Sequence, residues 1–290
     1  MAAPMRDKVP IKLSVAVLTR NRPESLDACL ESLRQQSVQP CEIVVSDDSE
    51  PSHQAAVCAV AERWNCRYVP GPRRGLYANR NSAASACAGT HIRTVDDDHR
   101  FPVDHFRICL EAVADDPESI WTVGERGFVD GKEYGVTERA NQLHPSGLGG
   151  AVGDPNDNWA IADGATIYPA AVFESGHRMV EWYGYGSSYL EFGAYLYRRG
   201  FRSRCVAGTI IDHYAGRETL DRGYHIHDIE SQLFSSFCYN LYFEPNHALA
   251  LKYLLACIIQ ARANPMFLKS IHRAYERAKM RWSGAAAQDR

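Results

Sequence analysis

Three consecutive acidic residues give the strongest chemical signal in this chain of 290 residues. They lie in the segment VDDDHRFP (95–102), after an apolar run that is typical of a buried strand. Clustered carboxylates repel one another, so such a strand end is costly unless a cation lies nearby. Side chains alternate along extended backbone, so Asp96 and Asp98 are expected on one side and Asp97 on the other. Two carboxylates on one side suit Mg²⁺ or Mn²⁺, which accept oxygen ligands and keep positions for phosphate.

The structural alternative for this segment is a solvated acidic turn, or a cap for a helix that begins near DHFRICLEAV. A second strand-like segment, EIVVSDDSE (42–50), also ends in acids, Asp47 and Asp48. A carboxylate there can accept a hydrogen bond from the ring N–H of a pyrimidine or guanine, worth about 1.5–3 kcal/mol. The alternative is capping of the helix that follows Pro51. Two acidic strand ends in one half of the chain favour a ligand site.

The order of elements predicts where these acids meet. Apolar runs predict strands, and helical spacing of Leu and Ala predicts the helices between them, the first of which begins at Pro23. The resulting βαβαβαβ order predicts an α/β fold with a doubly wound, mostly parallel sheet and helices on both faces. Ligands bind such sheets beyond the carboxyl ends of the strands, where the acids lie. The predicted strands are 12–18, 42–46, 66–69 and 91–95, and the later helices are 54–64 and 76–88.

The second half of the chain is less regular. Segment 124–164 is rich in Gly, Asn, Asp and Pro, and we predict a long loop there that could act as a lid. A helix over 188–200 ending at Gly200 and a strand over 202–208 follow. The tail, 228–282, is predicted to form two helices interrupted near Pro245 and Pro265. We therefore predict a catalytic domain over 10–222, with a nucleotide-binding half (10–115) and an acceptor-side half (116–222), and a helical C-terminal extension over 223–290.

Composition excludes several classes of protein. A formal net charge of -3 argues against a nucleic-acid-binding protein. The N-terminus, MAAPMRDKVP, has no apolar region of a secretory signal, and the run YLLACIIQA is too short to span a bilayer. Nine cysteines occur without a CxxC pair, which indicates reduced thiols and a cytoplasmic protein.

Three segments, taken in order, resemble a known family. LSVAVLTRNRPESLDACLESL, EIVVSDDS and GLYANRNSAASACAGTHIRTVDDDHRFP together are similar to the inverting glycosyltransferase family 2, which has the GT-A fold, over roughly 12–110. The resemblance implies that Thr19, Asn21 and Arg22 contact the nucleotide and that Asp48 holds its base. It also implies that Arg80 and Asn81 lie near the nucleotide. By the same resemblance, ribose and metal are held by Asp96 and Asp98, with Asp97 close by.

The resemblance continues into the second half, with one departure. ADGATIYPAAVFESG (162–176) looks like the acceptor-side segment of the family, and WYGYGSSYLEFGAYLYRRGFR (182–202) is similar to its Gly-Glu-Asp-x-Glu-Phe-Gly segment. Ser188 and Tyr189 stand where the Glu-Asp pair usually stands, and that Asp is the expected general base. Glu191 is the nearest remaining carboxylate and Asp163 is the second candidate. Glu191 could instead be a first-turn acid stabilised by the helix dipole.

Two further groups complete the predicted site. Related enzymes use a His after the last strand as a metal ligand, which implies this role for His213. Trp182, Tyr183 and Tyr185 could form a platform for the acceptor, because aromatic rings stack on sugars; the alternative is ordinary core packing. His225 and His227 are candidate lid residues.

These features predict a metal-dependent glycosyltransferase that moves a sugar from a nucleotide diphosphate sugar, with UDP favoured, to a hydroxyl acceptor with inversion. Mn²⁺ or Mg²⁺ would neutralise the leaving diphosphate. The missing Glu-Asp pair favours an alternative, a nucleotide-sugar binding module of the same fold without turnover. LTRNRPES lacks the Gly-rich loop of a nucleotidyltransferase, and no GxGxxG of a dehydrogenase follows the first strand. The acceptor stays unidentified, and the sequence allows both peripheral membrane contact by the amphipathic tail and a homo-oligomer.

Overall fold

The first half of the chain forms the parallel part of one sheet. A computed structural model describes residues 10–216, 226–261 and 265–283. Its strands pair in the order β3-β2-β1-β4, all parallel, which confirms the predicted βαβαβαβ arrangement. All seven residues of β1 are buried, as expected for a strand covered on both faces. These elements are β1 (Leu13–Thr19), α1 (Pro23–Arg34), β2 (Glu42–Asp47), α2 (Pro51–Arg63), β3 (Arg67–Pro70), α3 (Leu76–Ala86) and β4 (His91–Asp96).

The second half extends this sheet with strands of both directions. The order continues β4-β10-β6-β11-β5, in which β10 is antiparallel to both neighbours and β11 is parallel to β6. A separate pair, β8 and β9, forms a small second sheet. The elements are β5 (His99–Arg100), α4 (His105–Asp115), β6 (Ile120–Val129), β7 (Lys132–Thr137), β8 (Gln142–Leu143), β9 (Gly149–Gly150), β10 (Thr166–Pro169), α5 (Ala171–Glu174), α6 (Ser188–Tyr197) and β11 (Ser203–Tyr214).

The prediction of a long loop over 124–164 was wrong for its first part. Strands β6 and β7 form an antiparallel hairpin, joined by Asp130 and Gly131. Both turn residues have positive φ, 48° and 72°, as a two-residue type I′ turn requires. The Asp-Gly pair after an apolar run was the available signal.

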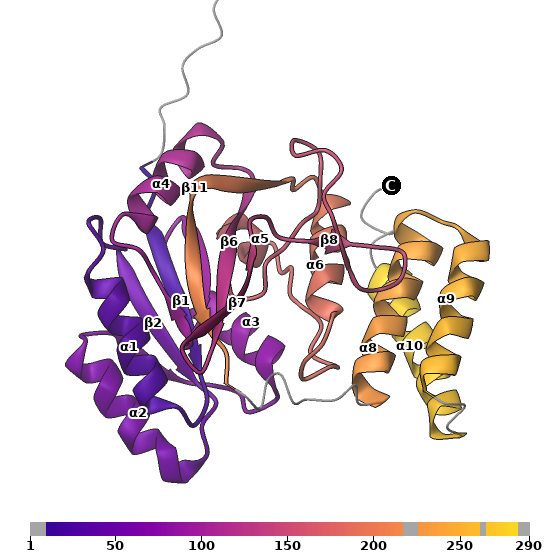
Figure 1. The fold of residues 1–290 in the computed structure, drawn as a ribbon, viewed down its shortest axis with the longest axis horizontal. Coiled ribbons are helices and arrows are strands. Elements are labelled where there is room, and N and C mark those ends of the chain that lie inside the picture. Colours follow the sequence, from indigo (N-terminus) through magenta and orange to yellow (C-terminus); the bar gives the residue numbers. More distant parts are fainter. Residues whose placement is uncertain (1–9, 217–225, 262–264, 284–290) are drawn as a thin grey trace, which may run out of the picture.

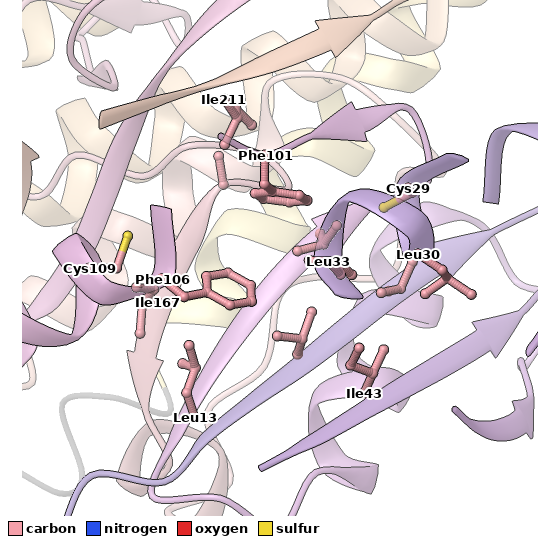
Figure 2. Packing of buried hydrophobic residues seen from close by; sticks show 14 of the residues in the cluster. Leu13, Cys29, Leu30, Leu33, Ile43, Phe101, Phe106, Cys109, Ile167 and Ile211 are labelled. Carbon is pink, nitrogen blue, oxygen red and sulfur yellow. The ribbon is translucent and has the colours of Figure 1, made fainter. Parts of the chain in front are cut away.

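Hydrophobic side chains fill both faces of the sheet. On one face, Leu30 and Leu33 of α1 and Phe106 of α4 pack against the strands, together with Leu13 and Ile167 (Figure 2). On the other face, a second cluster joins the strands to α3, α5 and α6 and includes Tyr77, Ile92, Tyr168, Val172 and Phe192. The predicted coverage of both faces by helices is confirmed.

The C-terminal segment holds three helices and a π-helical turn in its described residues. They are α8 (Ile226–Phe237), η1 (Cys238–Phe243), α9 (His247–Gln260) and α10 (Pro265–Ser283), and they form a group beyond α6 (Figure 1). The breaks near Pro245 and Pro265 are confirmed, although the described residues form three helices where two were predicted. Pro265 is the first residue of α10, a position in which proline is well tolerated. Leu190 and Ala194 of α6 share a hydrophobic cluster with Leu233, Phe234 and Trp282.

All nine cysteines lie in the described ranges and are free thiols. Within those ranges, no helix combines the length and apolar character that a membrane crossing requires.

Candidate functional site

A cavity of about 980 Å³ opens at the carboxyl ends of the strands. Thr19 closes β1, Asp48 follows β2, and Asp96 closes β4, so three parallel strands deliver polar side chains to one edge of the sheet. Strands β6 and β11, from the second half of the chain, add Glu125 and His213. Of the predicted residues, the lining includes Thr19, Asn21, Arg22, Asp48, Asp96, Asp98, Asp163, Trp182, Tyr183, Tyr185 and His213.

The three consecutive acids have three different sets of partners. Asp97 is buried and accepts hydrogen bonds from Thr19 Oγ1 (2.7 Å) and from Arg22. Asp98 Oδ2 accepts a hydrogen bond from Arg22 Nη1 at 3.1 Å, and Asp96 pairs with Arg80 at 3.0 Å. Strand β4 ends at Asp96 and a turn follows, so the predicted alternation of side chains does not extend to Asp97 and Asp98.

Burial and the two arginines set the protonation of the buried acids. Burial raises the pKa of Asp97 to about 7, although Arg22 opposes this shift. Burial also acts on Asp96, but the Arg80 guanidinium outweighs it and holds the pKa of Asp96 below its ordinary value. Asp96 is therefore an ionised carboxylate at the cavity wall.

Asp98, His99 and His213 form a group that could hold a metal ion. One ligand atom from each residue lies within 4.8 Å of the others. Asp98 Oδ1 is buried without a hydrogen-bond partner among the described residues, and it lies 3.7 Å from His213 Nε2 and 4.0 Å from His99 Nε2. A carboxylate oxygen beside two imidazole nitrogens fits Mn²⁺ better than Mg²⁺, which prefers oxygen ligands.

This group differs from the predicted ligand set by one residue. Asp96, predicted as a ligand, is outside it and pairs with Arg80 instead, whereas His99 was missed. His99 directly follows the acids, and that position was the available signal. Burial lowers the pKa of His99 to about 4, so its ring is neutral, and its Nδ1 accepts a hydrogen bond from the Asp96 backbone N–H at 3.4 Å. Burial also lowers the pKa of His213, but Glu125 and Asp98 outweigh it and raise the value to about 9.

The side chains of Asp47 and Asp48, at the end of β2, have different surroundings. Asp47 is buried and accepts hydrogen bonds from the Ser49 backbone N–H (2.8 Å) and the Tyr68 hydroxyl (2.9 Å). Asp48 faces the cavity, and its Oδ1 accepts a hydrogen bond from the Arg73 backbone N–H at 2.8 Å. A Cβ at Gly71 would lie 2.3 Å from Asp48 Oδ1, so only glycine leaves room for this carboxylate.

The segment after β1 shapes the rim of the cavity. Asn21 has a φ of 58°, and its Oδ1 accepts a hydrogen bond from the Glu50 backbone N–H at 2.9 Å. Asn81, predicted near the nucleotide, instead donates from its amide to the Met179 carbonyl at 2.9 Å and does not line the cavity. Arg80 is also behind the wall, where it is fully buried.

Asp163 and Glu191, the two candidate bases, lie in different surroundings. Asp163 lines the cavity and lies 2.7 Å from Arg80 Nη2, and burial raises its pKa to about 6. Glu191 is fully buried outside the cavity lining. It accepts hydrogen bonds from Arg281 Nε (3.1 Å) and Trp282 Nε1 (3.0 Å). The structure therefore argues against Glu191 as a base and gives it a role in packing α6 against α10.

The predicted aromatic platform divides into exposed and buried rings. Trp182 and Tyr185 line the cavity with exposed fractions of 37% and 49%. Tyr183 also borders the cavity, but its ring is buried against Phe234, with centroids 5.3 Å apart. The side chains of His225 and His227, the candidate lid residues, lie outside the described part of the chain.

Sequence reasoning also missed residues of the cavity wall. Among them are the ionisable residues Glu125, Tyr189 and Asp228. Burial raises the pKa of the Tyr189 phenol, so this side chain stays protonated where a carboxylate was expected. No local sequence pattern marks Glu125 or Asp228 as a cavity residue. Each reaches the cavity through the packing of segments that are distant in the sequence.

Comparisons with known proteins point to one group of enzymes. A family model described as Glycosyl transferase family 2 matches residues 14–175. No match was found among curated proteins. S. aureus TarS 1-349 in complex with UDP-GlcNAc is a similar solved structure, with 15% identity and a TM-score of 0.65 over 94% of this chain and 82% of that chain.

A second similar structure is GalNAc-T7 with UDP, GalNAc and Mn²⁺, with 15% identity and a TM-score of 0.64. The match covers 82% of this chain and 49% of that chain, so this chain spans about half the length of GalNAc-T7. At such identities the likeness shows a shared fold.

Proposed function

Because the chain belongs to glycosyl transferase family 2 and has the GT-A fold, we propose that it transfers a sugar from a UDP-sugar to a hydroxyl group, with the help of a divalent cation. The observation that carries this proposal is one cavity lined by Asp48, Asp98 and His213, the last two of which belong to the Asp98–His99–His213 group. The titles of the similar structures name UDP, UDP-GlcNAc and Mn²⁺, which supports the choice of donor and cation.

Donor binding in this proposal uses the strand ends. Asp48 Oδ1 accepts the Arg73 backbone N–H, and we assign the ring N–H of uracil to the same carboxylate. Asp96, an ionised acceptor at the wall, is assigned to the ribose hydroxyls. Thr19 and Arg22 orient the acidic turn through Asp97 and Asp98.

Asp98, His99 and His213 would hold the cation. When bound, Mn²⁺ supplies positive charge that stabilises the leaving diphosphate. Arg22 contacts Asp98 Oδ2 and leaves Oδ1 without a partner, so the carboxylate is oriented before any ligand arrives.

Asp163 is the proposed base for the acceptor hydroxyl. It is a cavity carboxylate with a pKa of about 6, which suits a group that accepts a proton near neutral pH. Arg80 holds it in place at 2.7 Å. Trp182 and Tyr185 offer exposed rings to a sugar acceptor, while Tyr183 supports them from the core. The same proposal includes inversion at the transferred sugar, on the basis of the family resemblance.

The second candidate is a nucleotide-sugar binding module without turnover. It is favoured by Ser188 and Tyr189, which replace the Glu-Asp pair of the family segment. Hydrolysis of UDP-sugars in the presence of Mn²⁺ separates the two functions, since a binding module leaves the donor intact. The cytoplasmic location, membrane contact and oligomeric state stay predictions.

The experiment that tests the proposal is a thermal denaturation series with UDP, GDP and dTDP, each with and without Mn²⁺. We expect the highest Tm with UDP and Mn²⁺ together, because uracil would bind at Asp48 while the cation binds beside Asp98. Asp98→Ala should remove the effect of Mn²⁺. Asp115→Ala, an exposed acid at the end of α4, is the matched control and should keep it. Stabilisation by UDP that ignores both Mn²⁺ and Asp98→Ala would count against the site.

A further inference from the structure

We propose that Glu125 is a positioning residue that fixes the orientation and tautomer of His213, so that His213 Nε2 faces Asp98. This inference rests on the proposed function, because it assigns a role to a residue beside the cation site. Glu125 is not a member of the Asp98–His99–His213 group, and its role is exerted through His213.

Strand pairing places the two side chains on one face of the sheet. Strands β6 and β11 are parallel, with Glu125 opposite Ile211 and Gly127 opposite His213. Because side chains alternate along a strand, Glu125 and His213 project to the same face, and both line the cavity. They are diagonal neighbours across the strand pair, within reach of a long side chain.

The contacts of the imidazole ring show which atom each acid addresses. His213 Nδ1 lies 3.8 Å from Glu125 Oε2, and His213 Nε2 lies 3.7 Å from Asp98 Oδ1. Nδ1 is buried and makes no hydrogen bond within the described part of the chain. Glu125 is thus the carboxylate placed to accept the Nδ1 proton after a small side-chain movement.

The position directly opposite His213 cannot supply this acceptor. It is Gly127, where a Cβ would lie 2.2 Å from Tyr134 Cζ, because the Tyr134 ring of β7 packs over the glycine. Because glycine has no side chain, Glu125 is the carboxylate of β6 beside the ring. An imidazole that donates Nδ1–H to a carboxylate presents its Nε2 lone pair to a cation, which is a common arrangement in metal sites.

A Mn²⁺ titration of the UDP-saturated protein tests the assignment. Free Mn²⁺ is followed by electron paramagnetic resonance, with a UDP-only blank to subtract binding by the nucleotide. We expect Glu125→Ala to weaken Mn²⁺ binding about 10- to 100-fold. Glu125→Gln should lose less, because its amide oxygen still accepts the Nδ1 proton. Glu133→Ala, on the neighbouring strand β7 and exposed, is the matched control and should bind like the wild type.

A double variant separates positioning from direct ligation. If Glu125 acts through His213, Glu125→Ala should add nothing in a His213→Ala background. An equal loss in both backgrounds would overturn the inference, as would wild-type affinity in Glu125→Ala. If Asp98→Ala abolishes Mn²⁺ binding while Glu125→Ala leaves it intact, the proposed function stands and only this inference fails. Absence of Mn²⁺ binding by the wild type would remove both.

Discussion

Asp47 and Asp48 are adjacent in sequence, but their side chains make different contacts. Asp47 supports Tyr68 and Ser49, whereas Asp48 faces the cavity. We expect Asp48→Asn to weaken UDP binding by about 1.5–3 kcal/mol, since it removes a charged acceptor. Asp47→Asn should lower the Tm of the free protein and leave the UDP affinity of folded molecules near that of the wild type. Calorimetric titration and thermal denaturation of both variants measure the two effects; equal losses of UDP affinity would contradict the assignment.

Asp163 offers a second test with a single residue. Asp163→Asn keeps the shape of the side chain but cannot take the proton of an acceptor hydroxyl. Transfer should fall about 10²- to 10⁴-fold, the usual contribution of a general base. UDP affinity should be unchanged. Asp157→Asn, an exposed acid that pairs with Arg202, is the control, and transfer at the wild-type rate by Asp163→Asn would rule out this base.

How far the sequence predicts the site depends on which forces place each residue. Asp48 was predictable because a local strand signal put it directly after β2, whereas Asp98 lies in the turn that follows β4. His99 follows a turn whose shape depends on Arg22 and Thr19, contributed from another segment. Glu125 reaches His213 only through the register of β6 and β11, which no short sequence window contains.

At the scale of elements, the ion pair between Glu191 of α6 and Arg281 of α10 links the two helices. Arg281 donates to Glu191 at 3.1 Å and to the Arg178 carbonyl at 3.0 Å. Arg281→Met leaves a buried carboxylate with only the Trp282 donor, at an expected cost of about 3–5 kcal/mol. Urea denaturation measures this loss.

Two further variants check the cause of that loss. Lys279→Met, on the exposed side of α10, should be close to neutral. The double variant Glu191→Met/Arg281→Met should be more stable than Arg281→Met alone, because it no longer buries an unpaired charge. A double variant that is equally unstable would show that lost packing, not the charge, is responsible.

The same contact explains why sequence reasoning failed for Glu191. Helical spacing placed Glu191 correctly in the first turns of α6, but the direction it faces depends on the C-terminal helices that cover it. Likewise, the β6–β7 hairpin was missed because its glycines and acids suggest a loop, although pairing with β11 on the other side of β6 stabilises the strand.

For the whole molecule, the C-terminal helices introduce a dependence of stability on pH. Glu230 of α8 is buried and pairs with Arg273 and Arg277 of α10. Burial alone would raise its pKa, but hydrogen bonds from Arg273 and Ser270 outweigh that effect and hold the pKa below the ordinary value of 4.5. A carboxyl group with a lowered pKa stabilises the fold above its ordinary value, and this contribution is lost as pH falls through the lowered one.

Glu230→Gln should therefore be less stable than the wild type at pH 7, by about 1–3 kcal/mol. The difference should shrink as the pH falls below 4.5, where the wild-type carboxyl takes up its proton. Chemical denaturation at several pH values gives both numbers. Glu276→Gln, exposed on α10, should show no such trend, and a constant difference for Glu230→Gln at all pH values would contradict the ionic contribution.

The distribution of thiols across the molecule has a practical consequence. Among the nine cysteines, all of which lie in the described ranges, Cys41 is the one with an exposed side chain. It precedes β2, whose far end carries Asp47 and leads to Asp48, and a strand of this length spans about 20 Å. A maleimide fluorophore should therefore attach mainly at Cys41, on the opposite edge of the sheet from the cavity, and could report on folding or tumbling without obstructing the nucleotide.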